Sequence, residues 1–253
     1  MRASPDLAPA VSPSSARSAA APARRRSARS RDGAPRVVVV SLAVPASLEW
    51  AVRLRRACPL RLVVRPWGDQ LGYEYLRRAG GVLAVLDSPT PEPLAELVQR
   101  VRSLRLLGPV AVALGHRVDP EPLLAAGALN VLNRETTASA LTARITADLR
   151  WLGRATGTEP DPTTTAPEPL KPSHRSQSLL LEILLGAQGP LCCHDVRYLL
   201  GEATRPMTLP ALRARIQRLG PHLAQHGLVC RRTVRWGADT FTLYATGAPQ
   251  RAG

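Results

Sequence analysis

A short stretch near the carboxyl end of the sequence combines basic and amide side chains with the period of a helix. Its apolar residues recur every three or four positions: Leu209, Leu212, Ile216 and Leu219. A helix with that spacing buries one stripe. Arg213 and Gln217 then fall on the exposed faces, together with either Arg215 or Arg218. Because arginine can bind guanine and glutamine can bind adenine through paired hydrogen bonds, the stretch predicts a helix that reads the major groove of double-stranded DNA.

A second basic group follows in a segment that predicts a β-hairpin. Two strand-like runs, 229–233 and 240–244, flank a turn across residues 236–239. The group consists of Arg231, Arg232 and Arg235. An arginine on such a hairpin can enter the narrow minor groove or bind a phosphate, and Arg235 is the first candidate. The alternative is that these arginines form a solvated basic face with no partner.

An acid and a base in the first half of the sequence are expected to lie at one edge of a sheet. Asp87 follows the apolar run 82–86, and Arg134 follows the short run 130–132. The carboxyl ends of parallel strands meet at the same edge, where ligands bind in open α/β sheets. Asp87 is interpreted as a helix-capping or turn residue before Ser88 and Pro89, or as a partner for Arg134.

The residues from 36 to 154 alternate short apolar runs with segments of helical period. Strands are expected at 37–40, 60–64, 82–86, 110–114 and 130–132, and helices at 47–57, 72–79, 92–106, 121–126 and 137–152. Val37–Val40 is a continuous apolar run, as a strand buried on both faces requires. The pattern predicts an α/β domain with a (βα)5, flavodoxin-like parallel sheet over 36–154.

The rest of the chain is divided by composition. Residues 1–35 form an expected disordered basic arm, 155–175 a linker rich in proline and threonine, and 247–253 a disordered tail. The arm could contact phosphates or remain solvated. Between linker and tail, residues 176–246 predict a small second domain with helices at 178–185, 193–200 and 208–219 before the hairpin. Gly220 and Pro221 are expected to end or kink the third helix.

Composition limits the possible functions. The formal net charge of +15 comes almost wholly from arginine, since Lys171 is the single lysine, and it predicts attraction to a polyanion such as nucleic acid. No apolar run approaches the ~20 residues that span a bilayer. The four cysteines lack the spacing of a zinc site. We therefore expect a reduced, cytoplasmic protein with no metal, no cofactor, no membrane contact and no enzymatic activity.

With these residues in place, the segment 36–154 resembles the receiver domain of response regulators. The resemblance places Asp87 at the phosphoacceptor position and Arg134 where the family has its lysine. The family also has an acidic pair after the first strand, which holds magnesium, but Ser41 and Leu42 stand at these places. The family's hydroxyl residue at the end of the fourth strand corresponds to Ala113 or Leu114. A hydroxyl and an alkyl group are poor ligands for a hard dication. The resemblance therefore implies a degenerate receiver that serves dimerisation or ligand sensing.

The segment 177–244 is similar to the OmpR/PhoB-type winged helix-turn-helix. Two stretches carry this resemblance, Arg215–Leu219 for the recognition helix and Arg231–Arg235 for the wing. The family contacts RNA polymerase through the loop that corresponds to residues 202–207, which looks altered here. The chain as a whole resembles an atypical response regulator.

The predicted function is that of a sequence-specific, DNA-binding transcriptional regulator of bacterial type. Double-stranded DNA is the expected partner of a homodimer, with RNA polymerase and a small-molecule effector as further candidates. Two alternatives remain open. The chain could be a protein-interaction adaptor whose winged helix binds another protein, or a response regulator that is still phosphorylated.

Overall fold

The computed structural model describes residues 36–78, 81–155 and 175–246. The predicted arm 1–35, the tail 247–253 and all but the two end residues of the predicted linker 155–175 lie outside the described residues. Within the described part of the chain, no helix is long and apolar enough to cross a bilayer.

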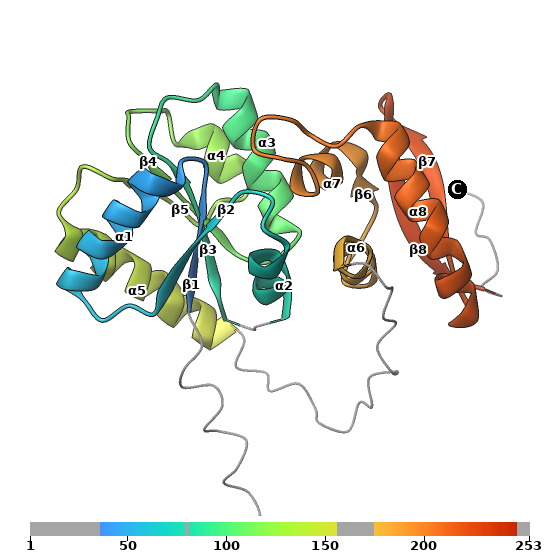
Figure 1. The fold of residues 1–253 in the computed structure, drawn as a ribbon, viewed down its shortest axis with the longest axis horizontal. Coiled ribbons are helices and arrows are strands. Elements are labelled where there is room, and N and C mark those ends of the chain that lie inside the picture. Colours follow the sequence, from blue (N-terminus) through green and yellow to red (C-terminus); the bar gives the residue numbers. More distant parts are fainter. Residues whose placement is uncertain (1–35, 79–80, 156–174, 247–253) are drawn as a thin grey trace, which may run out of the picture. The chain divides into compact units, whose positions relative to one another are not determined.

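The first half of the described chain is built on a five-stranded parallel sheet. The strands are β1 (Val37–Ser41), β2 (Leu62–Pro66), β3 (Leu83–Ser88), β4 (Val110–Leu114) and β5 (Asn130–Asn133). Their order is β2-β1-β3-β4-β5, and every neighbouring pair is parallel. This order is that of the flavodoxin-like, doubly wound fold, so the predicted α/β sheet is confirmed (Figure 1).

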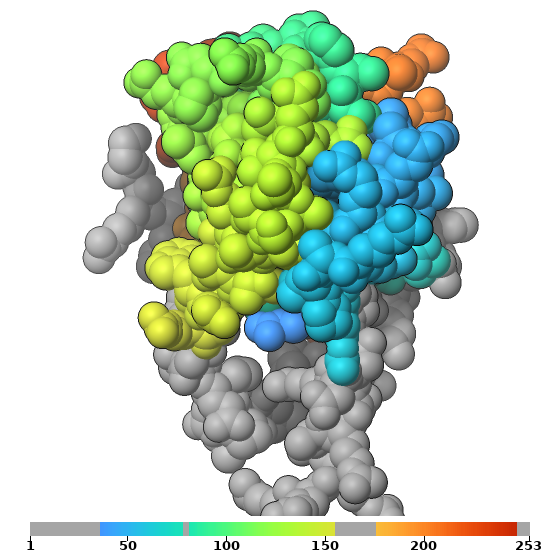
Figure 2. Space-filling model, turned by 90° about the vertical axis from the view of Figure 1, so that its left-hand side faces the viewer, coloured from blue at the N-terminus to red at the C-terminus, as the bar shows by residue number. Residues whose placement is uncertain are grey.

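Helices cover both faces of this sheet. They are α1 (Val44–Ala57), α2 (Gln70–Arg78), α3 (Leu94–Arg105), α4 (Glu121–Ala125) and α5 (Ala138–Ala155). Val37 and Val39 of β1 pack with α1 and α5, whereas Val38 and Val40 pack with α2, α3 and α4. Alternate side chains of β1 thus enter different cores, which is why the whole strand is apolar. Figure 2 shows α1 (blue) beside α5 (yellow-green) on one face.

The second half consists of three helices and a small antiparallel sheet. Its elements are α6 (Arg175–Leu185), β6 (Leu191–Cys192), α7 (Cys193–Leu199), α8 (Leu209–Gln225), β7 (Leu228–Arg235) and β8 (Ala238–Ala245). The strand order is β6-β8-β7, so β7 is an edge strand. Thr208 begins α8 by accepting a hydrogen bond from the Ala211 amide at 3.4 Å.

Several sequence expectations about element boundaries were wrong. Helix α8 does not end at Gly220 but continues through Pro221 to Gln225, because Leu219 and Leu223 are fully buried on either side. The hairpin turn is two residues long rather than four. Helix α1 begins three residues before Ser47, and strand β6 was not expected at all.

The two halves make polar and apolar contacts within one compact unit. The Trp67 indole donates to the Tyr198 carbonyl at 3.1 Å. Arg100 is 3% exposed, stacks over Trp67 at 5.1 Å and donates to the Ala203 carbonyl at 2.6 Å. Because the Trp67 indole and the Arg100 guanidinium are buried, each hydrogen bond offsets the free energy lost when its donor was removed from water.

Candidate functional site

The outward face of α8 carries two of the predicted site residues. Leu212, Leu219 and Leu223 form the buried stripe of this helix. Gln217 and Arg218 are exposed and lie roughly opposite that stripe. A planar amide and a guanidinium on one exposed helix face can form hydrogen bonds to base edges or phosphate oxygens.

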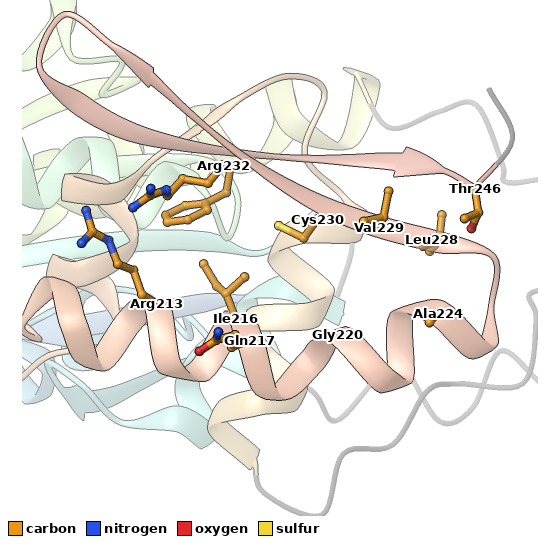
Figure 3. Close-up of a pocket in the computed structure, with 11 residues that line it drawn as sticks. Arg213, Ile216, Gln217, Gly220, Ala224, Leu228, Val229, Cys230, Arg232 and Thr246 are labelled. Atoms are coloured by element: carbon orange, nitrogen blue, oxygen red, sulfur yellow. The ribbon is translucent and has the colours of Figure 1, made fainter. Parts of the chain in front are cut away.

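Arg213 is turned toward the hairpin instead. Its guanidinium Nη2 lies 2.7 Å from Oδ2 of Asp239, a carboxylate with 5% of its side chain exposed. Arg232 of β7 approaches the same oxygen at 3.7 Å. Figure 3 shows Arg213 and Arg232 at one end of the space between α8 and β7. The Asp239 carboxylate therefore ties the helix to the hairpin.

Arg215 lies on the other flank of α8 and is partly buried. Within the described residues its Nη1 atom is buried without a hydrogen-bond partner. Burial lowers the pKa of its guanidinium, and the nearby Arg218 lowers it further. The structure thus separates the four predicted residues of α8: Arg213 and the exposed Gln217 line the side next to β7, whereas the exposed Arg218 and the partly buried Arg215 lie away from it.

The three arginines of β7 are all exposed. Arg231 stacks over the Tyr244 ring at 5.3 Å, and Arg232 shares Asp239 with Arg213. Arg235 is the last residue of β7, next to the turn. Among the described residues it has no ion-pair partner, so its charge is available to a ligand.

A groove of about 610 Å³ runs between α8 and the edge strand β7. Ile216, Leu228, Cys230 and Phe241 contribute its apolar lining (Figure 3). Burial raises the pKa of the Cys230 thiol to about 11. Cys230 is therefore a neutral thiol at physiological pH rather than a reactive thiolate.

The second candidate site lies at the carboxyl edge of the five-stranded sheet. Asp87 is fully buried in β3, beside Ser41 of β1 in the register. The Ser47 hydroxyl donates to Asp87 Oδ2 and also lies 2.6 Å from the Ser41 hydroxyl. Arg134 Nε lies 3.3 Å from the other carboxylate oxygen, Oδ1. Asp87 is thus a strand residue paired with Arg134 rather than a turn or cap.

Arg134 is itself held in place from two sides. Its Nη2 donates to the Ala46 carbonyl at 2.8 Å, and its guanidinium stacks over Trp50 at 5.4 Å. Burial raises the pKa of Asp87, while the Ser47 hydrogen bond and the Arg134 charge act in the opposite direction. The carboxylate oxygens therefore face protein groups, and the side chain has no exposed surface for a reactant.

Sequence reasoning missed Ser47 as a partner of Asp87. The two residues are 40 positions apart, and the predicted helix began at Ser47 rather than at Val44. A helix that begins at Val44 places Ser47 in its first turn, next to the sheet edge. Pro45 was the available signal, because proline is favoured in the first turn of a helix.

Solved structures similar to this chain are response-regulator receiver domains that cover about half of it. The signal receiver domain of a candidate Luxo repressor from Vibrio parahaemolyticus is 17% identical, with a TM-score of 0.39, over 50% of this chain and 98% of that one. A response regulator receiver protein from Burkholderia phymatum is 28% identical, with a TM-score of 0.34, over 46% of this chain and 95% of that one.

A third structure, from the streptococci, covers more of the chain. It is described as a redox sensor evolved from two-component response regulators, and it is 14% identical, with a TM-score of 0.35, over 83% of this chain and 99% of that one. No protein-family model matches this chain, and no curated protein matches it in sequence. Because these TM-scores are below 0.5, the receiver-like fold rests on the strand order and the helices on both faces.

Proposed function

We propose that this chain is a sequence-specific DNA-binding transcriptional regulator whose receiver-like half works without phosphorylation. The observation that carries the DNA-binding part is the juxtaposition of two basic surfaces, the outward face of α8 and the exposed strand β7. Homodimer formation, RNA polymerase contact and a small-molecule effector remain predictions.

The order of elements after residue 175 supports this proposal. A helix, a short strand, two helices and a hairpin follow one another, as in a winged helix-turn-helix with α8 as its recognition helix and β7–β8 as its wing. Six arginines and one carboxylate lie between Leu209 and Ala245. They are Arg213, Arg215, Arg218, Arg231, Arg232, Arg235 and Asp239. Because Asp239 is engaged by Arg213 and Arg232, the surface itself remains strongly positive.

The geometry divides the roles among these residues. Gln217 and Arg218 are exposed on α8 and would contact base edges in the major groove. Arg235 and Arg231 on the wing would contact phosphates or the minor groove. Arg213 and Arg232 would hold the helix and wing in a fixed relation through Asp239.

The DNA-binding part is tested by fluorescence anisotropy with a labelled mixed-sequence duplex. Phosphate contacts release counterions, so affinity should fall steeply as salt rises from ~50 to ~200 mM. Arg218→Glu and Arg235→Glu should each weaken binding by about tenfold, and Arg235→Glu should also reduce the salt slope by about one. Arg144→Glu, on the exposed surface of α5, changes the net charge equally and serves as the control.

Two results would contradict this part of the proposal. If Arg218→Glu, Arg235→Glu and the control Arg144→Glu all lost the same duplex affinity, overall charge rather than this surface would attract DNA. A wild-type chain that binds no duplex at low salt would favour the adaptor function, in which the same surface binds a protein.

The phosphorylation-independent part of the proposal rests on the Asp87 site. Asp87 has no exposed surface and contacts Ser47 and Arg134. A receiver would need magnesium here, but the side-chain oxygens that meet at this point among the described residues belong to one carboxylate and two serine hydroxyls. The Arg134 guanidinium adds a positive charge beside them. Magnesium prefers several carboxylate and water oxygens, so these residues do not fit the ion.

Acetyl phosphate, or magnesium with beryllofluoride, tests this part directly. We expect the intact mass, the oligomeric state and the duplex affinity of the wild-type chain to stay unchanged after incubation. Asp87→Asn should bind the duplex as tightly as the wild type does. A phosphoryl adduct on the wild type that is lost in Asp87→Asn would overturn phosphorylation independence and leave DNA binding unaffected.

A further inference from the structure

The hairpin turn places a tryptophan in a backbone conformation that tryptophan rarely adopts. Arg235 pairs with Ala238, so Trp236 and Gly237 alone form the turn. Their φ angles are 48° and 75°. Two positive φ angles are characteristic of a tight hairpin turn that favours Asn-Gly. Trp236 is the one non-glycine residue with positive φ in the described part of the chain.

The fold gains little from the indole at this position. Trp236 is 100% exposed, whereas Trp50 and Trp67 are 2% and 5% exposed and fill the cores around the parallel sheet. An unfavourable backbone conformation that is not offset by packing suggests a role outside the folded chain. The fully exposed aromatic ring is available to a partner.

The surroundings of Trp236 indicate the chemistry of that partner. Arg235 precedes it, and Arg231 and Arg232 lie further along the same exposed strand. The nearby carboxylate, Asp239, is buried and paired with Arg213 of α8. That ion pair also ties the base of the turn to the first half of α8. The tip therefore presents an aromatic ring next to the exposed cation Arg235, beside the helix proposed to read DNA.

We propose that Trp236 is a wedge that enters the minor groove and stacks against a base step when α8 lies in the adjacent major groove. This inference rests on the proposed DNA-binding function. Apolar side chains that insert between base pairs kink the duplex, and pyrimidine–purine steps unstack most readily. Trp236 thus favours sites with a TA or CA step beneath the wing.

The experiment compares full-length variants on a duplex of ~30 base pairs with a central TA step. Trp236→Asn removes the indole but places at this turn a residue that tolerates positive φ, so the hairpin should keep its fold. Because Trp236→Asn loses the stacking on one base, its Kd for the duplex should be about tenfold higher than that of the wild type. The Kd of Trp236→Phe should stay within about threefold of the wild-type value. Trp151→Asn, at a 58% exposed position on α5, should leave the Kd unchanged.

Acrylamide quenching reports on the indole itself. Adding duplex should protect part of the wild-type tryptophan fluorescence from acrylamide, and Trp236→Asn should lose that protection. A membrane surface is the other polyanion that attracts arginine and tryptophan, so the same measurement is made with vesicles of anionic phospholipid. We expect the vesicles to give no protection from acrylamide.

The outcomes separate this inference from the proposed function. If the wild type binds duplex with a steep salt dependence and Trp236→Asn binds equally well, the wedge is wrong and DNA binding stands. Protection by vesicles without protection by duplex also overturns the wedge. If the wild type binds no duplex, the proposed function fails and the wedge fails with it.

Discussion

At the scale of single residues, the Asp87 network has a measurable consequence for stability. Burial raises the pKa of Asp87 above 3.8, so the folded state binds the proton of this carboxyl more tightly than the unfolded state does. The resulting contribution to stability is complete below about pH 3.8 and is lost as the pH rises through the raised pKa. Asp87→Asn stays neutral, so its free energy of unfolding, compared with that of the wild type, should be higher at pH 7 than at pH 4. Urea unfolding across this range measures the difference.

Glu135 is an exposed carboxylate after β5, and Glu135→Gln is the control for this pH series. The difference in free energy of unfolding between this variant and the wild type should change little with pH. A wild-type chain that gains stability over Asp87→Asn as the pH rises would contradict the expectation. It would mean that Arg134 and Ser47 outweigh burial.

At the scale of elements, α8 contains two exposed prolines in different positions. Pro210 lies in the first turn, where the amide N–H has no partner within the helix in any case. Pro221 lies inside the helix, where it removes a donor to the Gln217 carbonyl and crowds that oxygen. Pro221→Ala should therefore raise the free energy of unfolding by about 1–3 kcal/mol, measured by urea denaturation.

Pro210→Ala is the matched control, since it changes the same residue type on the same helix and should leave stability unchanged or lower it slightly. Equal stabilisation by the two variants would contradict the argument from helix position.

At the scale of the whole molecule, Arg100 links the parallel sheet to the C-terminal elements. It donates to the Ala203 carbonyl, stacks on Trp67 and lies 3.5 Å from carboxylates of Glu92 and Glu96. Arg100→Ala leaves the partly buried Ala203 carbonyl without its donor and a space beside the indole. We expect a loss of about 2–4 kcal/mol in the free energy of unfolding.

Urea unfolding followed by tryptophan fluorescence and circular dichroism tests this link, because Trp67 lies at the contact. Arg144→Ala, an exposed arginine on α5, should change stability by less than about 0.5 kcal/mol. If Arg100→Ala were as stable as this control, the contact would contribute nothing to folding.

Local patterns in the sequence were sufficient to predict the parallel sheet and most helices. The apolar run of β1 indicated a strand buried on both faces, and the spacing of Leu212 and Leu219 indicated the buried stripe of α8. Such patterns are visible because a helix repeats its buried residues every three or four positions, whereas a strand buried on both faces is apolar throughout. The path of α8 through Pro221 was not predicted, because packing of Leu219 and Leu223 outweighs local helix propensity.

By itself, the sequence determined which segments are apolar, basic or helical, and where Asp87 and the arginines stand along the chain. The pairing of Asp87 with Arg134 was one of the alternatives offered by the sequence, but tertiary structure alone decided the other partners. Ser47 meets Asp87 across 40 residues, Arg213 meets Asp239 across 26, and Arg100 meets Ala203 across 103. No local period encodes such pairs, since each depends on how separate elements pack and on which polar groups are buried together.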